Sequence, residues 1–143
     1  MGKGQKDKVK REFSAGGVVF KRKQGKTYWL LINPAGSERW QLPKGHIDDG
    51  EESQKSAIRE VLEETSVEAK PISKVESMQY FFWENGKRIL KSVTFYLMEF
   101  VSGGKKKPDH EIGKAGFYTY DKALKMLTFK DEKDILRKAS SLL

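Results

Sequence analysis

A row of glutamates beside an apolar stripe, between residues 51 and 64, constrains the fold of this chain more than any other feature. The segment contains Glu51, Arg59, Glu60, Glu63 and Glu64. At the period of a helix, Ala57 and Val61 lie one turn apart on an apolar face. Glu60 and Glu64 lie one turn apart on the adjoining face. The spacing predicts an amphipathic helix over 52–64, with one face in a core and the next made of carboxylates.

The carboxylate face is unfavourable on its own. Like charges three or four positions apart each destabilise a helix by about 0.2–0.5 kcal/mol. A bound cation removes that repulsion, and Mg²⁺ and Mn²⁺ prefer oxygen ligands such as carboxylates. The helix therefore predicts a site for a divalent cation, Mg²⁺ or Mn²⁺.

The spacing of this motif resembles the signature of the Nudix hydrolases. Gly45 is followed after five residues by Glu51, and seven further residues lead to the run REVLEETSV at 59–67. The one departure is Ser66, where that family has glycine just past the helix end, a position that commonly takes the left-handed backbone conformation. Serine removes no metal ligand there, and we expect it to cost about 1 kcal/mol or to change the cap.

The resemblance implies a fold and a reaction, and it extends from about Phe13 to the C-terminus. Nudix proteins are α/β proteins, with an α/β/α sandwich around a mixed β-sheet. Their chemistry is attack of water on a phosphoanhydride bond, in which the protein positions groups and stabilises developing charge. The resemblance implies Glu60 and Glu64 as metal ligands, with Glu63 binding directly or through water and the main-chain carbonyl of Lys44 completing the cage. Either Glu60 or Glu64 could instead orient the attacking water.

Three further charged residues join this expected site. Arg59 lies one turn from Glu63 and is expected to hold a glutamate by a charge-assisted pair. Glu51 is expected to bridge to the metals or to Arg59. Glu111 precedes the last expected strand, where many Nudix proteins bring a carboxylate to a metal or to the water; the alternative is an ordinary exposed loop glutamate.

The approach to the motif resembles one group within the superfamily. The run WQLPKGH at 40–46 is similar to that of diadenosine tetraphosphate hydrolases, and residues 91–98 are similar to bacterial and archaeal members of the group. Lys44 suits a polyphosphate oxygen, and we place His46 in the substrate site beside it.

Four consecutive aromatic residues, 80–83, support a nucleotide substrate. Alternate residues of a strand point to opposite faces, so two of the four rings are expected in the core. Tyr80 and Phe82 form one set, and Lys87 and Arg88 follow. Aromatic faces stack adenine and cations bind phosphate. We therefore expect the substrate to be bound by Tyr80, Phe82, Lys87 and Arg88.

Short periodic segments separated by turn residues predict the other elements. Asn85-Gly86 is typical of a tight turn between two long strands. Ser53 is expected as the N-cap of the helix 52–64, and Asp121 and Asp131 are expected at the starts of two further helices. The expected strands are 13–21, 28–33, 40–42, 71–83, 88–101 and 117–120, and the expected helices are 52–64, 121–127 and 131–141.

Length and composition agree with one compact domain. A chain of 143 residues with 37% hydrophobic residues can bury one core. The absence of cysteine excludes a disulfide framework and a thiolate zinc site, and no apolar run approaches the roughly 20 residues of a membrane span. We expect a soluble, cytoplasmic protein with a single domain at 13–143 and a flexible basic arm at 1–12. The net charge of +8 leaves two explanations open, solubility and binding of RNA or a polyphosphate tail.

These observations lead to three functional hypotheses. The first is asymmetric cleavage of diadenosine tetraphosphate to ATP and AMP, with a small nucleotide as partner and nucleic acid possible but not favoured. The second is a housecleaning nucleoside triphosphate pyrophosphohydrolase or an RNA 5′-pyrophosphohydrolase. The third is a catalytically silent module that binds nucleotide or RNA. Oligomeric state is not encoded in any of these features.

Overall fold

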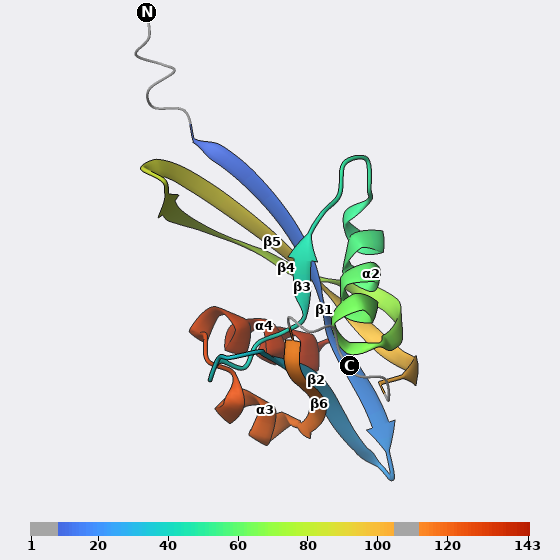
Figure 1. The fold of residues 1–143 in the computed structure, drawn as a ribbon. Helices are drawn as coiled ribbons and strands as arrows, with labels where there is room; N and C mark the ends of the chain where they lie inside the picture. The colour runs from blue at the N-terminus through green and yellow to red at the C-terminus, as the bar shows by residue number, and fades with distance from the viewer. Residues whose placement is uncertain (1–8, 105–111) are drawn as a thin grey trace, which may run out of the picture.

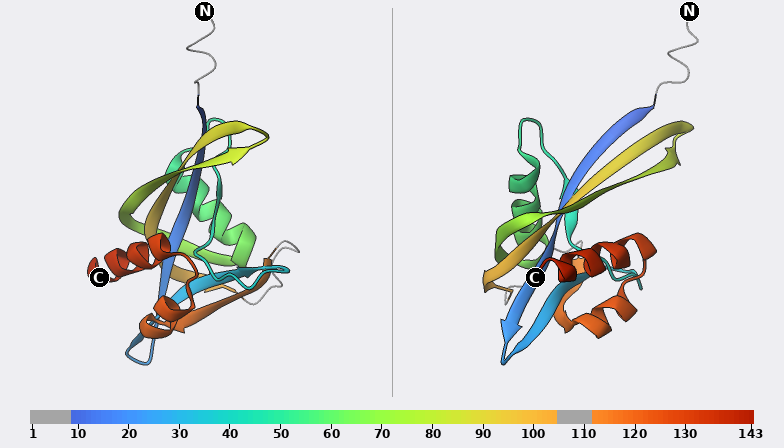
Figure 2. Two further views of the ribbon diagram at one scale, coloured as in Figure 1. Left: turned by 90° about the vertical axis from the view of Figure 1, so that its left-hand side faces the viewer. Right: turned by 180° about the vertical axis from the view of Figure 1, so that it is seen from behind.

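Helices lie on both faces of a six-stranded mixed sheet in the computed structural model, which describes residues 9–104 and 112–143 (Figure 1). Helix α2 (Ser53–Thr65) covers one face. Helices α3 (Tyr120–Met126) and α4 (Lys130–Ser141) cover the other, as the view from behind in Figure 2 shows. The expected α/β sandwich around a mixed sheet is confirmed. Within the described residues, no helix is long and apolar enough to cross a membrane.

The strand order places β1 at the centre of the sheet. The strands are β1 (Lys10–Lys23), β2 (Lys26–Pro34), β3 (Lys44–His46), β4 (Val67–Glu84), β5 (Lys87–Gly103) and β6 (Ile112–Thr119). Their order is β4-β5-β1-β2-β6, and the short β3 pairs with β1 beside β2. Only β1 and β5 run parallel, whereas the other pairs are antiparallel.

Two apolar clusters, one on each face of the sheet, hold the layers together. On the α2 face, Ala57 and Val61 pack with Ala15, Val19 and Met98. On the opposite face, the cluster joins the sheet to α3 and α4 and includes Trp29, Phe95, Leu127, Ile135 and Leu136. Alternation along β1 and β5 produces this division, because successive strand residues face opposite sides.

The first residues of β1 and the hairpin end of β4 and β5 project beyond the helices as a three-stranded arm (Figure 2). We call the strand segments 10–13, 79–84 and 87–92 the projecting arm. Its turn is at Asn85-Gly86, where φ is 53° and 74°. Positive φ at both residues is the geometry of the tight hairpin turn expected from this dipeptide.

Most expected elements are confirmed, with longer strands than the sequence suggests. Strand β1 begins at Lys10 and not at Phe13, because residues 10–12 pair with 89–91 of β5. The expected arm 1–12 therefore contributes its last three residues to the sheet, and residues 1–8 lie outside the described part. Strand β4 includes Pro71, which its place at the edge of the sheet permits, since β4 pairs only with β5.

Two expectations about the approach to α2 are wrong. Residues 40–42 do not form a strand; Gln41 makes only an isolated bridge to Ile32, and the strand is β3 at 44–46. Gly16 explains the shift, because a side chain there would collide with the Pro43 carbonyl and keep β3 away from β1. The N-cap of α2 is Glu52 and not Ser53, and it makes no side-chain cap hydrogen bond.

Candidate active site

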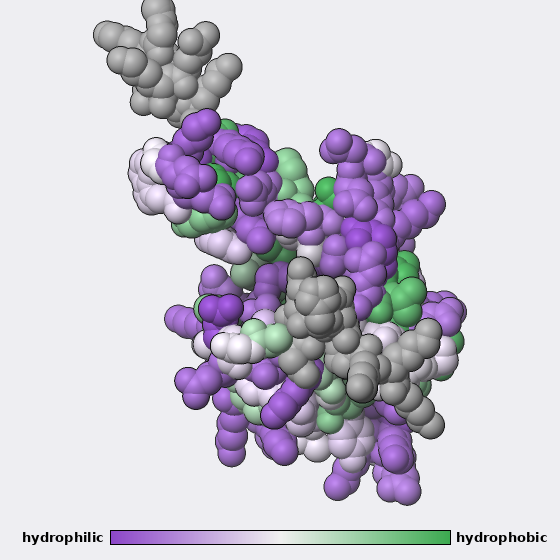
Figure 3. All heavy atoms as spheres, in the orientation of Figure 1, coloured by the Kyte–Doolittle hydropathy of each residue, from purple (hydrophilic) through white to green (hydrophobic). Residues whose placement is uncertain are grey.

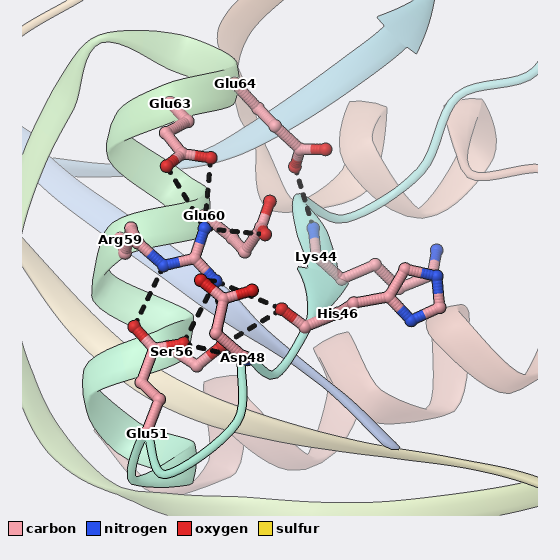
Figure 4. Close-up of polar contacts among 9 residues, drawn as sticks. All are labelled: Lys44, His46, Asp48, Glu51, Ser56, Arg59, Glu60, Glu63 and Glu64. Carbon is pink, nitrogen blue, oxygen red and sulfur yellow. Dashed lines mark hydrogen bonds and ion pairs between the residues drawn. The ribbon is translucent and has the colours of Figure 1, made fainter. Parts of the chain in front are cut away.

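Arg59 is the centre of the polar contacts on α2 (Figure 4). Its Nε and Nη2 donate to the two oxygens of Glu51, at 2.9 and 3.0 Å. Its Nη1 donates to Glu60 at 3.0 Å and to Glu63 at 3.1 Å, and its Nη2 donates to the His46 carbonyl at 3.0 Å. One guanidinium thus ties the loop before α2 to two glutamates of the helix. The Arg59 hydrogen bonds lower the pKa of Glu51 to about 2 and the glutamates raise the pKa of Arg59.

Glu60 and Glu64 lie in a drier and less compensated setting than Glu51. Burial raises the pKa of Glu60, even though the charge of Arg59 opposes the shift. Burial and the neighbouring Glu60 charge raise the pKa of Glu64 to about 8. The backbone N–H of Lys44 donates to Glu64 at 2.9 Å and partly opposes that rise. Glu60 and Glu64 are therefore two half-buried carboxylates close to one another. The positive charge near them does not offset the effect of burial on their pKa values.

Gly45 lets this pair sit against strand β3. A Cβ atom at Gly45 would collide with the Glu60 carboxyl group. Glycine is therefore required at the first position of the motif because the Glu60 side chain occupies the place of a side chain at 45. The close approach also keeps Lys44, next in β3, within hydrogen-bonding distance of Glu64.

The oxygen donors in this region suit a hard divalent cation. Carboxylates are the ligands that Mg²⁺ and Mn²⁺ prefer, and a cation would relieve the repulsion that raises both pKa values. No group of three histidine, aspartate or glutamate side chains converges as a ready cage in residues 9–104 and 112–143. Arg59 accounts for this arrangement, because it draws Glu51, Glu60 and Glu63 toward its own guanidinium.

Glu132 is a site residue that the sequence prediction missed. This α4 side chain is 2% exposed, and it accepts hydrogen bonds from the Leu42 N–H at 2.8 Å and the Lys44 ammonium at 2.9 Å. The Lys44 side chain is thus already paired with a carboxylate. A signal was available: Glu132 stands at helical spacing with Ile135, Leu136 and Ala139, which are all buried. An acidic residue in an apolar stripe indicates a buried partner.

His46 and Glu111 are the two remaining residues that were expected near the carboxylates of α2. The His46 carbonyl accepts hydrogen bonds from Arg59 and Ser56, but the side chain is exposed and points away from the glutamates in Figure 4. Glu111 lies outside the described residues, so its expected place near the metal stays a prediction.

The aromatic strand divides between the two faces of the sheet, as alternation predicts. The expectation that two of its four rings lie in the core is wrong, because Tyr80, Phe81 and Trp83 are exposed and Phe82 is half-buried on a part of β4 that projects beyond the helices. Tyr80 and Phe82 share one face, with ring centroids 6.3 Å apart. Lys91 pairs with both Tyr80 and Glu12 across the strands, so these three side chains form a row on that face. Burial raises the pKa of Tyr80, and the charge of Glu132 adds to the rise. Burial and the charge of Lys44 lower the pKa of Lys91.

The basic pair after the turn does not join Tyr80 and Phe82 as one group. The Arg88 guanidinium lies 4.0 Å from the centroid of the Phe81 ring, on the opposite face of the sheet. Lys87 pairs with Glu84 at the hairpin end. Lys91, which the sequence analysis did not select, is the cation that lies beside Tyr80.

Two named relatives each cover about nine tenths of this chain, and a third matches a shorter part of it. A protein of Mycobacterium tuberculosis that carries the name mutator protein MutT4 is 32% identical over 138 residues, which are 92% of this chain and 56% of that protein. A bis(5′-nucleosyl)-tetraphosphatase (asymmetrical) of Caenorhabditis elegans is 28% identical over 91% of this chain and 95% of its own length. An RNA pyrophosphohydrolase of Sphingopyxis alaskensis is 41% identical over 51 residues, 36% of this chain and 32% of that protein.

A solved structure agrees with these sequence relationships. The C. elegans Ap4A hydrolase in a binary complex superimposes with a TM-score of 0.74 over 92% of this chain and 96% of that one, at 28% identity. The resemblance expected from residues 40–67, to the Nudix superfamily and to the diadenosine tetraphosphate hydrolase group, is confirmed. The sequence model of the NUDIX domain family matches residues 10–139, and the chain therefore belongs to that family.

Proposed function

We propose that the protein is a Mg²⁺- or Mn²⁺-dependent hydrolase of phosphoanhydride bonds, and that its substrate is diadenosine tetraphosphate. Water attacks one phosphorus of the polyphosphate bridge, one P–O bond breaks, and the products are ATP and AMP. The observation that carries the proposal is the pair of semi-buried carboxylates, Glu60 and Glu64, held against β3 beside Lys44.

We assign metal binding to Glu60, Glu63 and Glu64, with the Lys44 carbonyl and Glu51 as supporting oxygens. When bound, the cation supplies positive charge that binds the phosphate oxygens and stabilises the charge that develops on them. Arg59 keeps Glu60 and Glu63 oriented through its fixed guanidinium geometry.

Glu64 is the better suited of the two buried carboxylates to accept a proton from the attacking water. In the metal-free protein its pKa is raised to about 8, which makes it a stronger base than an ordinary glutamate once its own proton has been released. The Lys44 N–H fixes one of its oxygens, and the other oxygen accepts no hydrogen bond from residues 9–104 and 112–143, so we assign it to the water. The Lys44 ammonium is paired with Glu132, which positions β3. We assign it a contact with a phosphate oxygen of the substrate as well, which it would make alongside this pair.

The face that carries Tyr80 and Phe82 is the proposed place for the nucleoside. Lys91 in the same row supplies a cation for phosphate. The hydroxyl of Ser14, two residues along β1 from Glu12, is buried and has no hydrogen-bond partner among the residues that the structure describes. An unpaired buried hydroxyl favours a bound polar group at this position.

Similarity to the C. elegans tetraphosphatase over nearly the whole chain favours the dinucleotide over the other substrates considered. The RNA pyrophosphohydrolase of S. alaskensis favours an RNA 5′-end as second candidate, but that similarity covers 36% of this chain. The same metal site serves both reactions, and only the groups that bind the nucleoside differ.

Product analysis separates these candidates. The protein is incubated with Mg²⁺ and diadenosine tetraphosphate, 8-oxo-dGTP or 5′-triphosphorylated RNA, and the products are resolved by anion-exchange chromatography. We expect ATP and AMP in equal amounts from the dinucleotide. Pyrophosphate from a triphosphate substrate, with the dinucleotide left intact, would overturn the assigned substrate.

Glu64→Gln tests the assigned chemistry. We expect kcat to fall by about 100-fold or more, because a lost charge or proton acceptor in a metal site is worth several kcal/mol. Glu68→Gln is the matched control, because Glu68 is an exposed carboxylate just after the same helix. Wild-type activity in both variants would contradict the role assigned to Glu64. Absence of hydrolysis by the wild type itself, on all three substrates, would instead indicate a silent nucleotide-binding module.

A further inference from the structure

The projecting arm exposes aromatic and basic side chains on the face opposite Tyr80. Cross-strand pairing places Arg11, Leu90 and Phe81 in one row. The row nearer the turn contains Arg88 and Trp83, and the row nearer the body begins with Phe13. We call these six residues the arm face: Arg11, Phe13, Phe81, Trp83, Arg88 and Leu90. None of them is part of the candidate active site as the structure arranges it. Arg88 was expected there, but its guanidinium lies against Phe81, on the opposite face of the sheet from Tyr80 and Phe82.

The rings of the arm face are unusually open to solvent. Phe13 is 54% exposed, Phe81 51% and Trp83 71%. Isolated exposed apolar residues are common on protein surfaces, but these three rings lie in adjacent rows on one face of the sheet, with Leu90 of β5 between Phe81 and β1. In Figure 3 the arm stands as a separate lobe, with hydrophobic residues among hydrophilic ones and a notch between it and the lobe that holds the α2 loop.

We propose that the arm face binds a single-stranded polynucleotide. Exposed rings on a sheet stack bases of any sequence, and a guanidinium plane does the same. The guanidinium carbon of Arg88 lies 4.0 Å from the centroid of the Phe81 ring, so the two side chains already contact one another. Trp83 and Phe81 are two residues apart on one strand, a spacing of about 7 Å, so that each can hold a different base.

Charge on the arm face suits a phosphate backbone. Arg88 lies in the row nearest the turn and Arg11 in the next row; both are exposed cations, and the six residues include no acid. The acidic loop of α2 meets the other end, where the Ile47 N–H donates to the Phe13 carbonyl at 3.1 Å and Asp48 follows. We therefore expect the phosphates to lie toward Arg11, Arg88 and the turn, away from that loop.

A second copy of the chain fits this surface less well. A symmetric contact would bring Arg11 and Arg88 of one copy toward the same residues of the other, and interface cores are depleted of charge. Stable interfaces also take roughly 20–30 residues from each side, which is several times the size of the arm face. A polynucleotide needs only a few rings and cations to bind.

Binding can be measured without hydrolysis. The full chain is titrated into a fluorescein-labelled ten-nucleotide adenosine RNA in EDTA, and fluorescence anisotropy is recorded at several salt concentrations. We expect saturable binding that weakens as the salt concentration rises. The slope of the logarithm of the association constant against the logarithm of the salt concentration should be about −1.4, which corresponds to about two phosphate contacts. Quenching of the exposed Trp83 emission should accompany it.

Substitutions on the arm face locate the contact. Trp83→Ser and Phe81→Ser should each weaken binding by about 5- to 150-fold, the range for losing one stacked base. Arg88→Gln should also reduce the salt slope. The matched control is Ile72→Ser, which removes an apolar side chain of β4 that is 50% exposed but lies outside the arm. None of these four variants should change the binding of Mg²⁺, because the metal-site glutamates are untouched.

Several outcomes would overturn the proposal. Absence of salt-dependent binding would do so, as would equal binding by Trp83→Ser, Phe81→Ser and the wild type. Tighter binding to a duplex of the same length would also do so, because paired bases cannot stack on the rings. A concentration-dependent dimer in sedimentation that Trp83→Ser abolishes, without RNA binding, would identify the surface as a contact between copies. Because the assay contains EDTA, its result does not depend on the hydrolase activity.

Discussion

Ser66 carries the only departure from the motif, and its backbone shows the cost of that departure. Its φ is 61°, in the left-handed region, and its N–H still donates to the Leu62 carbonyl at 2.8 Å. The helix end is thus retained with the conformation that glycine takes without strain. Gly103 lies against the Ser66 carbonyl, and a side chain at 103 would collide with it.

Ser66→Gly should therefore stabilise the protein. We expect the free energy of unfolding to rise by about 0.5–1 kcal/mol, because relief of left-handed strain exceeds the added entropy of the unfolded chain. Urea unfolding followed by tryptophan fluorescence measures the change. Ser140→Gly, within α4, is the control and should lower stability. A decrease with Ser66→Gly would show that the serine side chain contributes a contact that compensates for the strain.

Sequence reasoning at this scale succeeded for residues within one periodic segment. The contacts of Arg59 with Glu51 and Glu63 follow from spacing along a loop and a helix. The pairing of Lys44 with Glu132 could not be predicted in the same way, because 88 residues separate the partners. Only the fold brings them together, although the acidic residue in an apolar stripe already indicated that Glu132 had a partner.

At the scale of elements, Arg59 connects the loop 46–51 to α2, and its effect depends on pH. The pKa of Glu51 is about 2 in the folded protein and near 4.5 in the unfolded chain. The folded state therefore releases this proton more readily. The contribution of Glu51 to stability is present above pH 4.5 and is lost as the pH falls toward 2.

We expect Glu51→Gln and Arg59→Gln to flatten the pH dependence of stability between pH 5 and pH 2.5. Each variant removes the contact between Arg59 and Glu51 that lowers the pKa of Glu51. The wild type should therefore lose stability more steeply on acidification than either variant. Urea unfolding midpoints at half-unit pH steps provide the measurement. Glu84→Gln, an exposed glutamate at the hairpin turn, should retain the wild-type slope. Parallel slopes in all four proteins would show that other carboxylates control acid unfolding.

The ion pair of Lys44 and Glu132, which is largely shielded from solvent, connects β3 to α4. Breaking a buried pair by removing one partner costs about 3–5 kcal/mol, since the other charge is left uncompensated. Lys44→Met and Glu132→Gln should each destabilise by about that amount, and the double variant by less than the sum. Urea unfolding of all four proteins completes the cycle. The exposed pair of Lys138 and Glu76, 2.8 Å apart, is the control and should couple by less than about 1 kcal/mol.

The element boundaries show where local patterns were insufficient. The hairpin turn, α2 and the long strands have local signals, and the structure confirms them. Strand β3 has none: residues 44–46 pair with β1 only because Gly16 and Gly45 let two backbones and the Glu60 side chain approach closely. Close approach is a property of the assembled sheet, and a segment of three residues is too short to show a period.

For the whole molecule, the raised pKa of Glu64 links stability, pH and metal binding. The folded protein holds this proton to about pH 8, whereas the unfolded chain releases it near 4.5. In the metal-free protein its contribution to stability is full below pH 4.5 and is lost as the pH rises through 8. A metal ion must displace the same proton, so its binding strengthens as the pH rises.

We expect the melting temperature in EDTA to fall from pH 6 to pH 9 more in the wild type than in Glu64→Gln. Added Mg²⁺ should raise the wild-type melting temperature more at pH 9 than at pH 6, and should have much less effect on Glu64→Gln. Differential scanning fluorimetry in matched ionic strength measures both. A Mg²⁺ effect that is independent of pH would contradict proton displacement at Glu64.

The contact of Lys44 with Glu132 also sets an order of events during synthesis. A ribosome that has completed residues 45–67 has made every residue of the motif, yet the carboxylate that holds Lys44 is made more than sixty residues later. Nascent chains paused after β5 would carry the full motif without that support. The contact between Lys44 and Glu132 can therefore form only after α4 has been made, so the candidate site is completed later in synthesis than its motif.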